Sequence, residues 1–441
     1  MSPHLWFATC VLLAGQDAPV SDDPSTLLAW AVDLPTPDER QDAVDVLMKR
    51  DTIDLDAWLA AAAEFMPGVD ELGHGQRIVM ADLHVEGELE ASELVLHVPR
   101  SVTLDTPAPL LVALHGAGGS GLQMAGMWQS VADELGAILL APSEFGPNEG
   151  FRGTPRERRA VLEAIRWTRR NYNIDENRIW LTGYSRGGHL TFDLALRFPG
   201  VFAAAAPQAG GARFDPARGR NNMRYLDNLT DLPLRAMVGA RDEADLVWSL
   251  QTFFARIAAR GIATADLVVV PDAGHSFNVH GGQDWAAWFG QHTREPWPES
   301  LVRRSAREDE NQNRWLSIGG FTKEVEETFE PTIRVRRGVT PDQNEVRVMV
   351  IDHSENITAR VAATFLEPGS IQLDAKQATQ VHLLLPAHWL TEKGPFTIRD
   401  GSRKKRVKIE PDRRVLLETF VERFDRTFLP VAEARVKVRG R

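Results

Sequence analysis

One short segment constrains the fold more than any other: a serine set between glycines in Gly183-Tyr184-Ser185-Arg186-Gly187-Gly188. The apolar run 178–182 before it predicts a buried strand, and residues 189–198 after it have the spacing of an amphipathic helix. A serine on a tight strand-to-helix turn is held clear of the sheet, and the glycines let the backbone turn and a ligand approach. We therefore expect Ser185 at the edge of a sheet, as a candidate nucleophile.

The segments on both sides of this turn alternate between predicted strands and predicted helices. Such alternation indicates a parallel sheet covered by helices on both faces, which is an α/β fold. Alternating apolar residues between 76 and 98 add a hairpin at the edge of this sheet. We expect strands at 109–114, 137–141, 178–182, 202–207, 234–239 and 265–270, and helices at 121–135, 155–171, 186–198, 246–260 and 283–292.

The 441 residues suffice for two or three domains, and the pattern changes along the chain. Residues 19–75 are acidic and alanine-rich, with helical spacing, and predict an N-terminal helical appendage. Residues 76–293 carry the α/β alternation. Residues 294–315, rich in Arg, Glu, Pro and Asn, are expected to be a linker. Residues 316–441 have mainly period-two patterns, typical of a β-rich, sandwich-like domain, with one helix near residues 413–424.

The first residues have the pattern of a secretory signal. The apolar run Leu5–Ala14 is followed by small residues, so we expect a signal peptide at 1–18 and an exported protein, periplasmic or secreted. The alternative is a short apolar N-terminal helix. The one cysteine, Cys10, lies in this segment, so the mature chain would contain no disulfide. Beyond it, no run of 18 apolar residues predicts a membrane span.

Charge and composition exclude several classes of function. A net charge of −11 argues against a nucleic-acid partner. The twelve histidines include no H-E-x-x-H pattern and no cysteine cluster, so no metal site is predicted. The basic run 403–406 is expected at an exposed strand edge, where charge discourages pairing. No feature of the sequence indicates an oligomeric state.

A serine becomes a good nucleophile only with a base to take its proton and an acid to orient that base. On a strand-turn-helix of this kind the partners follow in the order serine, acid, histidine. Asp242 and His275 come after two later predicted strands, at the strand ends where sites form in open α/β sheets. We interpret His275 as the base and Asp242 as the acid, with Asp245 and Glu243 as alternatives.

A glycine-rich loop supplies a further element of the site. His115-Gly116-Ala117-Gly118-Gly119 follows the apolar strand that ends at Leu114. The tetrahedral intermediate of acyl transfer carries an oxyanion that two backbone N–H groups can stabilise. One donor is expected at Arg186, directly after the serine. For the second we favour Ala117, with the glycine on either side as the alternative.

Four positions are candidates for contact with a substrate. His115 and Gly116 lie in the glycine-rich loop, and Tyr184 directly precedes the serine. His115 is expected to order its loop rather than to act as a base. Phe145 lies in the loop 144–152 after a predicted strand, which either lines the pocket for the acyl or alcohol group or is a plain connection.

The same glycines also fit a dinucleotide-binding pattern. Gly116-x-Gly118-x-x-Gly121 follows a strand and opens a helix, and Glu144 lies near the position of a ribose-binding acid. That pattern is short and permissive. It also leaves the serine turn, Asp242 and His275 unexplained. We therefore favour a catalytic serine over a nucleotide site.

Together these residues resemble the α/β-hydrolase superfamily. The closer resemblance is to secreted esterases of the polyhydroxybutyrate depolymerase, feruloyl esterase and acetyl xylan esterase type, and peptidases of the prolyl oligopeptidase group are similar in the same stretches. The resemblance covers roughly residues 90–293, and it rests on 114–119, 177–188 and Gly274-His275.

The resemblance implies an α/β-hydrolase fold and an esterase that needs no cofactor. Ser185 would be the nucleophile, His275 the base and Asp242 the acid. The implied substrate is a small or polymeric carboxylic ester, with polysaccharide-linked acyl groups and polyesters among the candidates. Two alternatives remain: a serine peptidase with the same three residues, and a non-catalytic binding protein on a hydrolase scaffold.

Overall fold

The computed structural model describes most of the chain outside the N-terminus. The expected signal peptide lies almost wholly outside the described residues, and so does Phe145. The described residues are 18–69, 71–144, 151–212, 214–215, 220–275, 282–326, 332–339, 345–352, 357–391 and 394–439.

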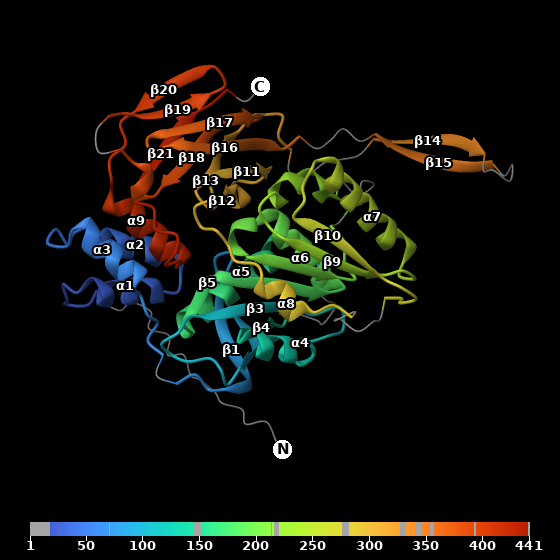
Figure 1. Cartoon of the computed structure of the whole chain (residues 1–441), viewed down its shortest axis with the longest axis horizontal. Helices are drawn as coiled ribbons and strands as arrows, with labels where there is room; N and C mark the ends of the chain where they lie inside the picture. Colours follow the sequence, from blue (N-terminus) through green and yellow to red (C-terminus); the bar gives the residue numbers. More distant parts are fainter. Residues whose placement is uncertain are drawn as a thin grey trace.

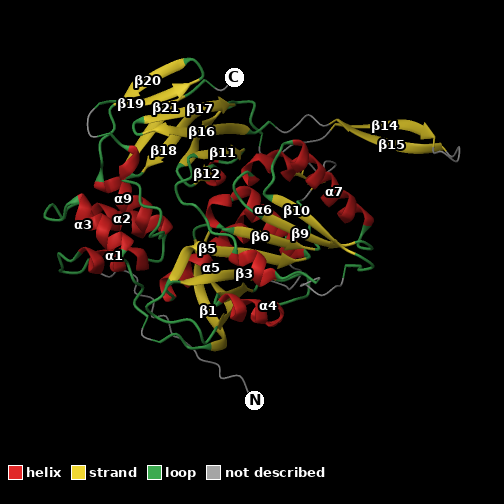
Figure 2. Cartoon of the chain, in the orientation of Figure 1, coloured by secondary structure: helices red, strands yellow, loops and turns green. Residues whose placement is uncertain are grey.

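An eight-stranded sheet forms the centre of the molecule (Figures 1 and 2), in the order β1-β2-β4-β3-β5-β6-β9-β10. β1 and β2 form an antiparallel hairpin at one edge, and β2 also pairs antiparallel with β4. The other neighbouring strands run parallel, so both the hairpin and the α/β fold are confirmed. The strands are β1 (Gly75–Val85), β2 (Glu88–Val98), β3 (Ala108–Leu114), β4 (Ile138–Pro142), β5 (Ile174–Tyr184), β6 (Ala204–Gln208), β9 (Leu234–Gly239) and β10 (Ala265–Val270).

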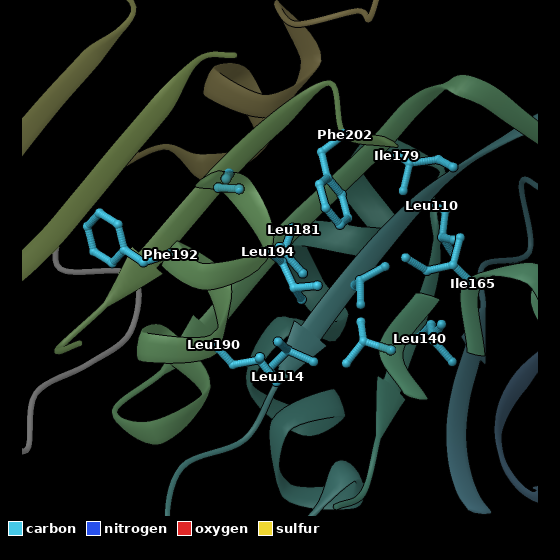
Figure 3. Close-up of a cluster of buried hydrophobic side chains, with 14 of the residues drawn as sticks. Leu110, Leu114, Leu140, Ile165, Ile179, Leu181, Leu190, Phe192, Leu194 and Phe202 are labelled. Atoms are coloured by element: carbon cyan, nitrogen blue, oxygen red, sulfur yellow. The ribbon is translucent and has the colours of Figure 1, made fainter. Parts of the chain in front are cut away.

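Helices cover both faces of this sheet. α4 (Gly121–Leu135) and α8 (Trp285–Gly290) pack on one face, around Trp128 and Phe289. α5 (Pro155–Asn171), α6 (Arg186–Arg197) and α7 (Ala244–Ala259) pack on the other. Figure 3 shows part of that second core, to which Ile165 and Leu190 of the helices belong together with Leu110, Leu140 and Leu181 of the strands. Each such leucine or isoleucine stabilises the fold by roughly 1.5–3 kcal/mol through its burial.

The N-terminal helices α1 (Pro24–Asp33), α2 (Pro37–Leu47) and α3 (Leu55–Ala63) form where the sequence predicted helices. They do not stand alone, because they share a hydrophobic cluster with α9 (Arg413–Arg423) near the other end of the chain. Leu27 and Trp58 pack in this cluster with Leu416 and Phe420, all fully buried. Among the helices that the structure describes, none is long and apolar enough to cross a lipid bilayer.

Arg166 fastens this helical group to the central domain. Its guanidinium, on α5, donates to the carbonyl of Val32 at 3.1 Å and to those of Val421 and Glu422 at 3.0 and 2.8 Å. These carbonyls lie in the last turns of α1 and α9, where the helix dipoles favour a cation. Burial, and then the nearby charge of Arg40, lowers the pKa of Arg166 to about 9.

The C-terminal part contains two sheets around one hydrophobic cluster, as expected for a β-rich domain. Leu373 from one sheet and Leu383 from the other are fully buried in it. The basic run 403–406 lies on the exposed edge strand β20, as predicted. The first sheet has the order β11 (Ser300–Ser305), β16 (Ala359–Glu367), β17 (Ser370–Lys376), β19 (Phe396–Asp400) and β20 (Arg403–Val407); the second has β12 (Gln312–Asn313), β13 (Leu316–Phe321), β18 (Ala378–Leu385) and β21 (Ala432–Lys437).

Two short hairpins lie outside these sheets. β14 (Thr332–Val339) and β15 (Glu345–Asp352) were expected among the strands of the β-rich domain, but they pair only with each other. They project from the body of the molecule in Figure 1. A second hairpin, β7 (Phe214–Asp215) and β8 (Arg220–Asn221), follows β6.

The segment 294–315 differs from the linker expected there. It contains β11, which pairs with β16 as the edge strand of the five-stranded sheet. Leu301, Arg303 and Ser305 of β11 point inward, so two of its three buried positions are polar. Arg303 is 1% exposed and donates to the carbonyls of Arg197 and Glu310. Because a charged residue occupies a buried position, the alternation of apolar and polar residues that predicts a strand is absent from this segment.

Candidate active site

Ser185 lies on the predicted turn, between the end of β5 and the start of α6. Its backbone has φ +53° and ψ −113°, a conformation that costs an L residue roughly 1–3 kcal/mol. The Ser185 N–H donates to the carbonyl of Gln208 at the end of β6, at 2.8 Å. A Cβ on Gly187 would collide with the carbonyl oxygen of Leu114, at the end of β3. Only glycine therefore lets the turn lie against the neighbouring strand.

A chain of hydrogen bonds starts at the Ser185 hydroxyl. Ser185 Oγ lies 2.9 Å from His275 Nε2, and His275 Nδ1 lies 3.0 Å from Asp242 Oδ1. An ionised carboxylate only accepts hydrogen bonds, so Nδ1 carries the proton that points at Asp242. Nε2 is then left with a lone pair that can accept the serine proton.

The loops after β9 and β10 carry Asp242 and His275. These strands are parallel neighbours, so their carboxyl ends meet at one edge of the sheet. The backbone N–H of Arg241 donates to the carbonyl of Ala273 at 2.7 Å, which ties the two loops together. The Asp242 side chain is fully buried against His275. Asp245, in contrast, is exposed in the first turn of α7.

The glycine-rich loop lies directly against the serine. A Cβ on Gly116 would be 3.2 Å from both Ser185 Cβ and the carbonyl oxygen of Tyr184. His115, buried beside it, donates from Nδ1 to the Gly116 carbonyl at 2.8 Å and accepts at Nε2 from the Glu144 N–H at 3.2 Å. Both ring nitrogens are used within the loop region. His115 therefore orders its loop, and Gly116 packs directly against the serine turn.

The two expected oxyanion donors lie close to Ser185 in the chain or through a neighbour. Arg186 is the first residue of α6, and the first N–H groups of a helix have no partner within the helix. The helix dipole adds positive potential at that end. Ala117 directly follows Gly116, which contacts Ser185. Both expected donors thus lie in segments next to Ser185, and their role stays a prediction.

Tyr184 has a contact that the sequence did not predict. Its hydroxyl donates to the backbone carbonyl of His275, and the two rings lie with their centroids 5.8 Å apart. Consecutive residues, Tyr184 and Ser185, thus hold the backbone and the ring of the same histidine. The sequence suggested only substrate contact for Tyr184, because its partner lies 91 residues away with no local signal.

The loop after β6 also supports the serine turn, and sequence reasoning named no residue there. Gln208 accepts the Ser185 N–H, and a Cβ on Gly210 would be 2.7 Å from the carbonyl oxygen of Ser185. His189 Nδ1 lies 2.7 Å from the carbonyl oxygen of Gly211. The sequence did contain a signal for this contact. The predicted strand 202–207 ends at the same edge of the sheet as the serine turn, and Gly210 and Gly211 follow it. In the described part of the chain, no group of three His, Cys, Asp or Glu side chains could hold a metal ion.

The chain is similar to several known hydrolases. A family model described as the dienelactone hydrolase family matches residues 152–313, which include the serine turn, Asp242 and His275. Feruloyl esterase B of Thermothelomyces thermophilus is 32% identical over 131 residues, which are 27% of this chain and 44% of that protein. Poly(3-hydroxyalkanoate) depolymerase C of Paucimonas lemoignei is 30% identical over 132 residues, 27% of this chain and 31% of that one. The chain thus spans less than half the length of these relatives.

Solved structures of esterases align with about half of the chain. A thermostable esterase aligns with 49% of this chain and 63% of its own, at 24% identity and a TM-score of 0.41. Acetyl xylan esterase from Aspergillus awamori aligns with 49% of this chain and 99% of its own, at 15% identity and a TM-score of 0.40.

Proposed function

Because this chain carries an α/β-hydrolase domain, part of which matches the dienelactone hydrolase family, we propose that it is a serine hydrolase that cleaves carboxylic esters. The observation that supports this most strongly is the hydrogen-bonded chain from Ser185 through His275 to Asp242. The strained turn at Ser185 adds to it, since such strain is concentrated at functional sites.

In the proposed reaction the Ser185 oxygen attacks the ester carbonyl while His275 Nε2 takes its proton. Asp242 holds the ring in the required tautomer and stabilises the imidazolium that forms. His275 then returns the proton to the alcohol oxygen as the carbon–oxygen bond breaks. A water molecule, deprotonated by the same nitrogen, hydrolyses the acyl-enzyme and releases the acid.

The negative charge of each tetrahedral intermediate falls on the former carbonyl oxygen. In this proposal the backbone N–H groups of Arg186 and Ala117 stabilise it. Removing one donor of this kind costs roughly 3–4 kcal/mol in known hydrolases. No step in this sequence requires a cofactor.

The substrate class is proposed from the curated relatives, which are named as feruloyl esterases, polyester depolymerases and an acetylxylan esterase/xylanase. We propose esters whose acyl group or alcohol belongs to a polymer, either a polysaccharide or a polyester. Small activated esters would react by the same steps because the hydrogen-bonded chain acts on the ester group itself.

A substrate panel on the purified protein tests the proposal. It contains p-nitrophenyl acetate and butyrate, methyl ferulate, acetylated xylan, a poly(3-hydroxybutyrate) film and an aminoacyl anilide. We expect hydrolysis of esters, its loss in Ser185→Ala, and full activity in Ser370→Ala, a control whose buried hydroxyl has no hydrogen-bond partner among the described residues. Ester hydrolysis that survives in Ser185→Ala would overturn the proposal, and preferential cleavage of the anilide would assign a peptidase instead.

A further inference from the structure

A buried cluster of charged side chains joins the α/β domain to the C-terminal part. Residues near the start of β5 and at the end of α5 meet the segment that follows α9. Three ion pairs lie in and around this cluster: Arg294 to Asp425 at 2.8 Å, Arg426 to Glu176 at 2.7 Å, and Arg314 to Asp231. Each of these arginines therefore has its own carboxylate.

Two further arginines of this cluster, Arg169 and Arg423, have no carboxylate in direct contact among the described residues. Arg169 donates only to the carbonyl of Arg423, at 3.0 Å, and its Nε is buried without a partner. Arg423 donates to the carbonyl of Arg314 at 3.2 Å and lies over the Phe428 ring at 4.5 Å. Within the described residues, no carboxylate lies within 4 Å of either guanidinium. Burial lowers the pKa of Arg169 and brings that of Arg423 to about 10, against the opposing effect of the charge of Asp425 on both.

Both side chains line a cavity of about 420 Å³ between α5 and the end of α9. Arg159, which has no carboxylate within 4 Å among the described residues, lies in the same wall, and Leu162, Val201 and Phe428 supply apolar surface. The cavity has room for a ligand larger than a water molecule or a chloride ion. None of its lining residues belongs to the Ser185 site.

Most acidic residues in the wall are already engaged. Glu310 binds Arg158 and Arg197, Asp309 binds Arg307, and Glu422 binds Arg40. Glu163 interacts with Arg166. Glu308 is exposed to solvent. Asp425, the remaining acid of the wall, acts by its charge on both Arg169 and Arg423 but is bound directly by Arg294. The cavity therefore offers two half-buried guanidinium groups, neither in contact with a carboxylate among the described residues, to an anion from outside the chain.

We propose that this cavity binds a small polyvalent oxyanion, a phosphate ester or a polycarboxylate, between Arg169 and Arg423. Guanidinium groups bind phosphate and carboxylate oxygens through paired, charge-assisted hydrogen bonds. The anion would link α5 of the α/β domain to the end of α9. It would therefore stabilise the junction of the two parts without touching the Ser185 site.

Calorimetric titration and thermal unfolding of the full chain test this, with inorganic phosphate and citrate as probes and sodium chloride to hold ionic strength constant. We expect saturable binding of phosphate or citrate, and a rise in Tm of about 3 °C at a hundredfold excess over Kd. The better of the two probes identifies the chemical class. Absence of saturable binding of both by the unmodified protein overturns the proposal, whatever the variants do.

Variants locate the site. Arg169→Gln and Arg423→Gln should each weaken binding by about tenfold or more. Arg403→Gln, which removes an exposed charge on β20, should leave it unchanged. If a glutamine variant does not fold, Arg423→Lys keeps the charge but loses the paired geometry, and should weaken binding as well. The assignment to this cavity would be contradicted if the cavity variants bound the anion as tightly as the unmodified protein, or if Arg403→Gln weakened binding as much as they do.

Discussion

The side chain of Asp242 is fully buried, whereas the His275 ring that it binds is 43% exposed. The carboxylate therefore holds one nitrogen of the ring inside the protein while the other faces Ser185 and the solvent. This arrangement fixes the tautomer at the protected nitrogen and leaves the reactive nitrogen accessible to a substrate.

Replacement of Asp242 by asparagine should therefore abolish most of the activity without unfolding the protein. An asparagine amide can donate to Nδ1, which would favour the tautomer with the proton on Nε2, where it cannot accept from Ser185. We expect kcat for p-nitrophenyl acetate to fall by roughly three to four orders of magnitude. Asp245→Asn is the matched control, and it should retain activity because Asp245 is exposed. If kcat fell strongly in Asp245→Asn and only slightly in Asp242→Asn, the acid would be Asp245 and the assignment to Asp242 would be wrong.

Tyr184→Phe should slow catalysis through the position of His275. The substitution keeps the ring and removes the hydrogen bond to the His275 carbonyl, which is worth about 0.5–1.5 kcal/mol. We expect kcat to fall roughly three- to tenfold with KM nearly unchanged. Tyr225→Phe is the control, because the Tyr225 hydroxyl is buried and finds no hydrogen-bond partner in the described part of the chain. A rise in KM with kcat unchanged would instead make Tyr184 a substrate-binding residue.

Gly187→Ala should both destabilise the protein and impair the site. Its Cβ would collide with the carbonyl of Leu114 and push α6, which begins beside Ser185, away from β3. Such overpacking typically costs about 1–3 kcal/mol. Gly126→Ala on α4 meets open space and should be neutral or stabilising by about 0.5–1 kcal/mol. Urea unfolding of both variants measures the difference, and equal stability would mean that the turn is less tightly packed than described.

The Arg294–Asp425 pair should make stability depend on pH in the acid range. Burial alone would raise the pKa of Asp425, but the charges of Arg294 and Arg169, with hydrogen bonds from Thr427 and Arg294, lower it from 3.8 to about 2. Since the folded-state pKa lies below the ordinary value, the stabilisation is complete above about pH 4 and is lost as the pH falls toward 2.

Asp425→Asn tests this relation. The variant should lose on the order of 3 kcal/mol at neutral pH, because it leaves Arg294 buried without a charge partner. It should also show a flatter decline of unfolding free energy between about pH 4 and pH 2. Asp45→Asn breaks an exposed pair with Arg414 and should change stability by less than about 1 kcal/mol. A variant whose acid profile matches that of the original protein would show that Asp425 is not responsible.

Local patterns predicted the α/β part of the fold well. The apolar run of β3 and the helical spacing around Leu190 and Leu194 depend only on neighbours in sequence, and they indicated the right elements. The serine, Asp242 and His275 followed from chain order, because parallel strands bring their carboxyl ends to one edge. The geometry now joins the three residues by hydrogen bonds.

What the sequence did not reveal depends on partners far away in the chain. The N-terminal helices looked like an appendage because α9, which completes their core, lies more than 300 residues later. β11 was hidden because Arg303, an inward residue, is charged and finds its acceptors in other elements. The hydrogen bond of Tyr184 to His275 was missed for the same reason, because no local sequence pattern indicates a partner in a distant loop.

Trapping of the acyl-enzyme tests the central claim most directly. The protein is mixed with p-nitrophenyl acetate, quenched with acid during turnover, digested and examined by mass spectrometry, with His275→Ala as a comparison. The account predicts an acetyl group on the peptide that contains Ser185, and on Ser185 itself after fragmentation, with little or none in His275→Ala. Turnover with no acyl group on Ser185, or with the acyl group on another side chain, would contradict it.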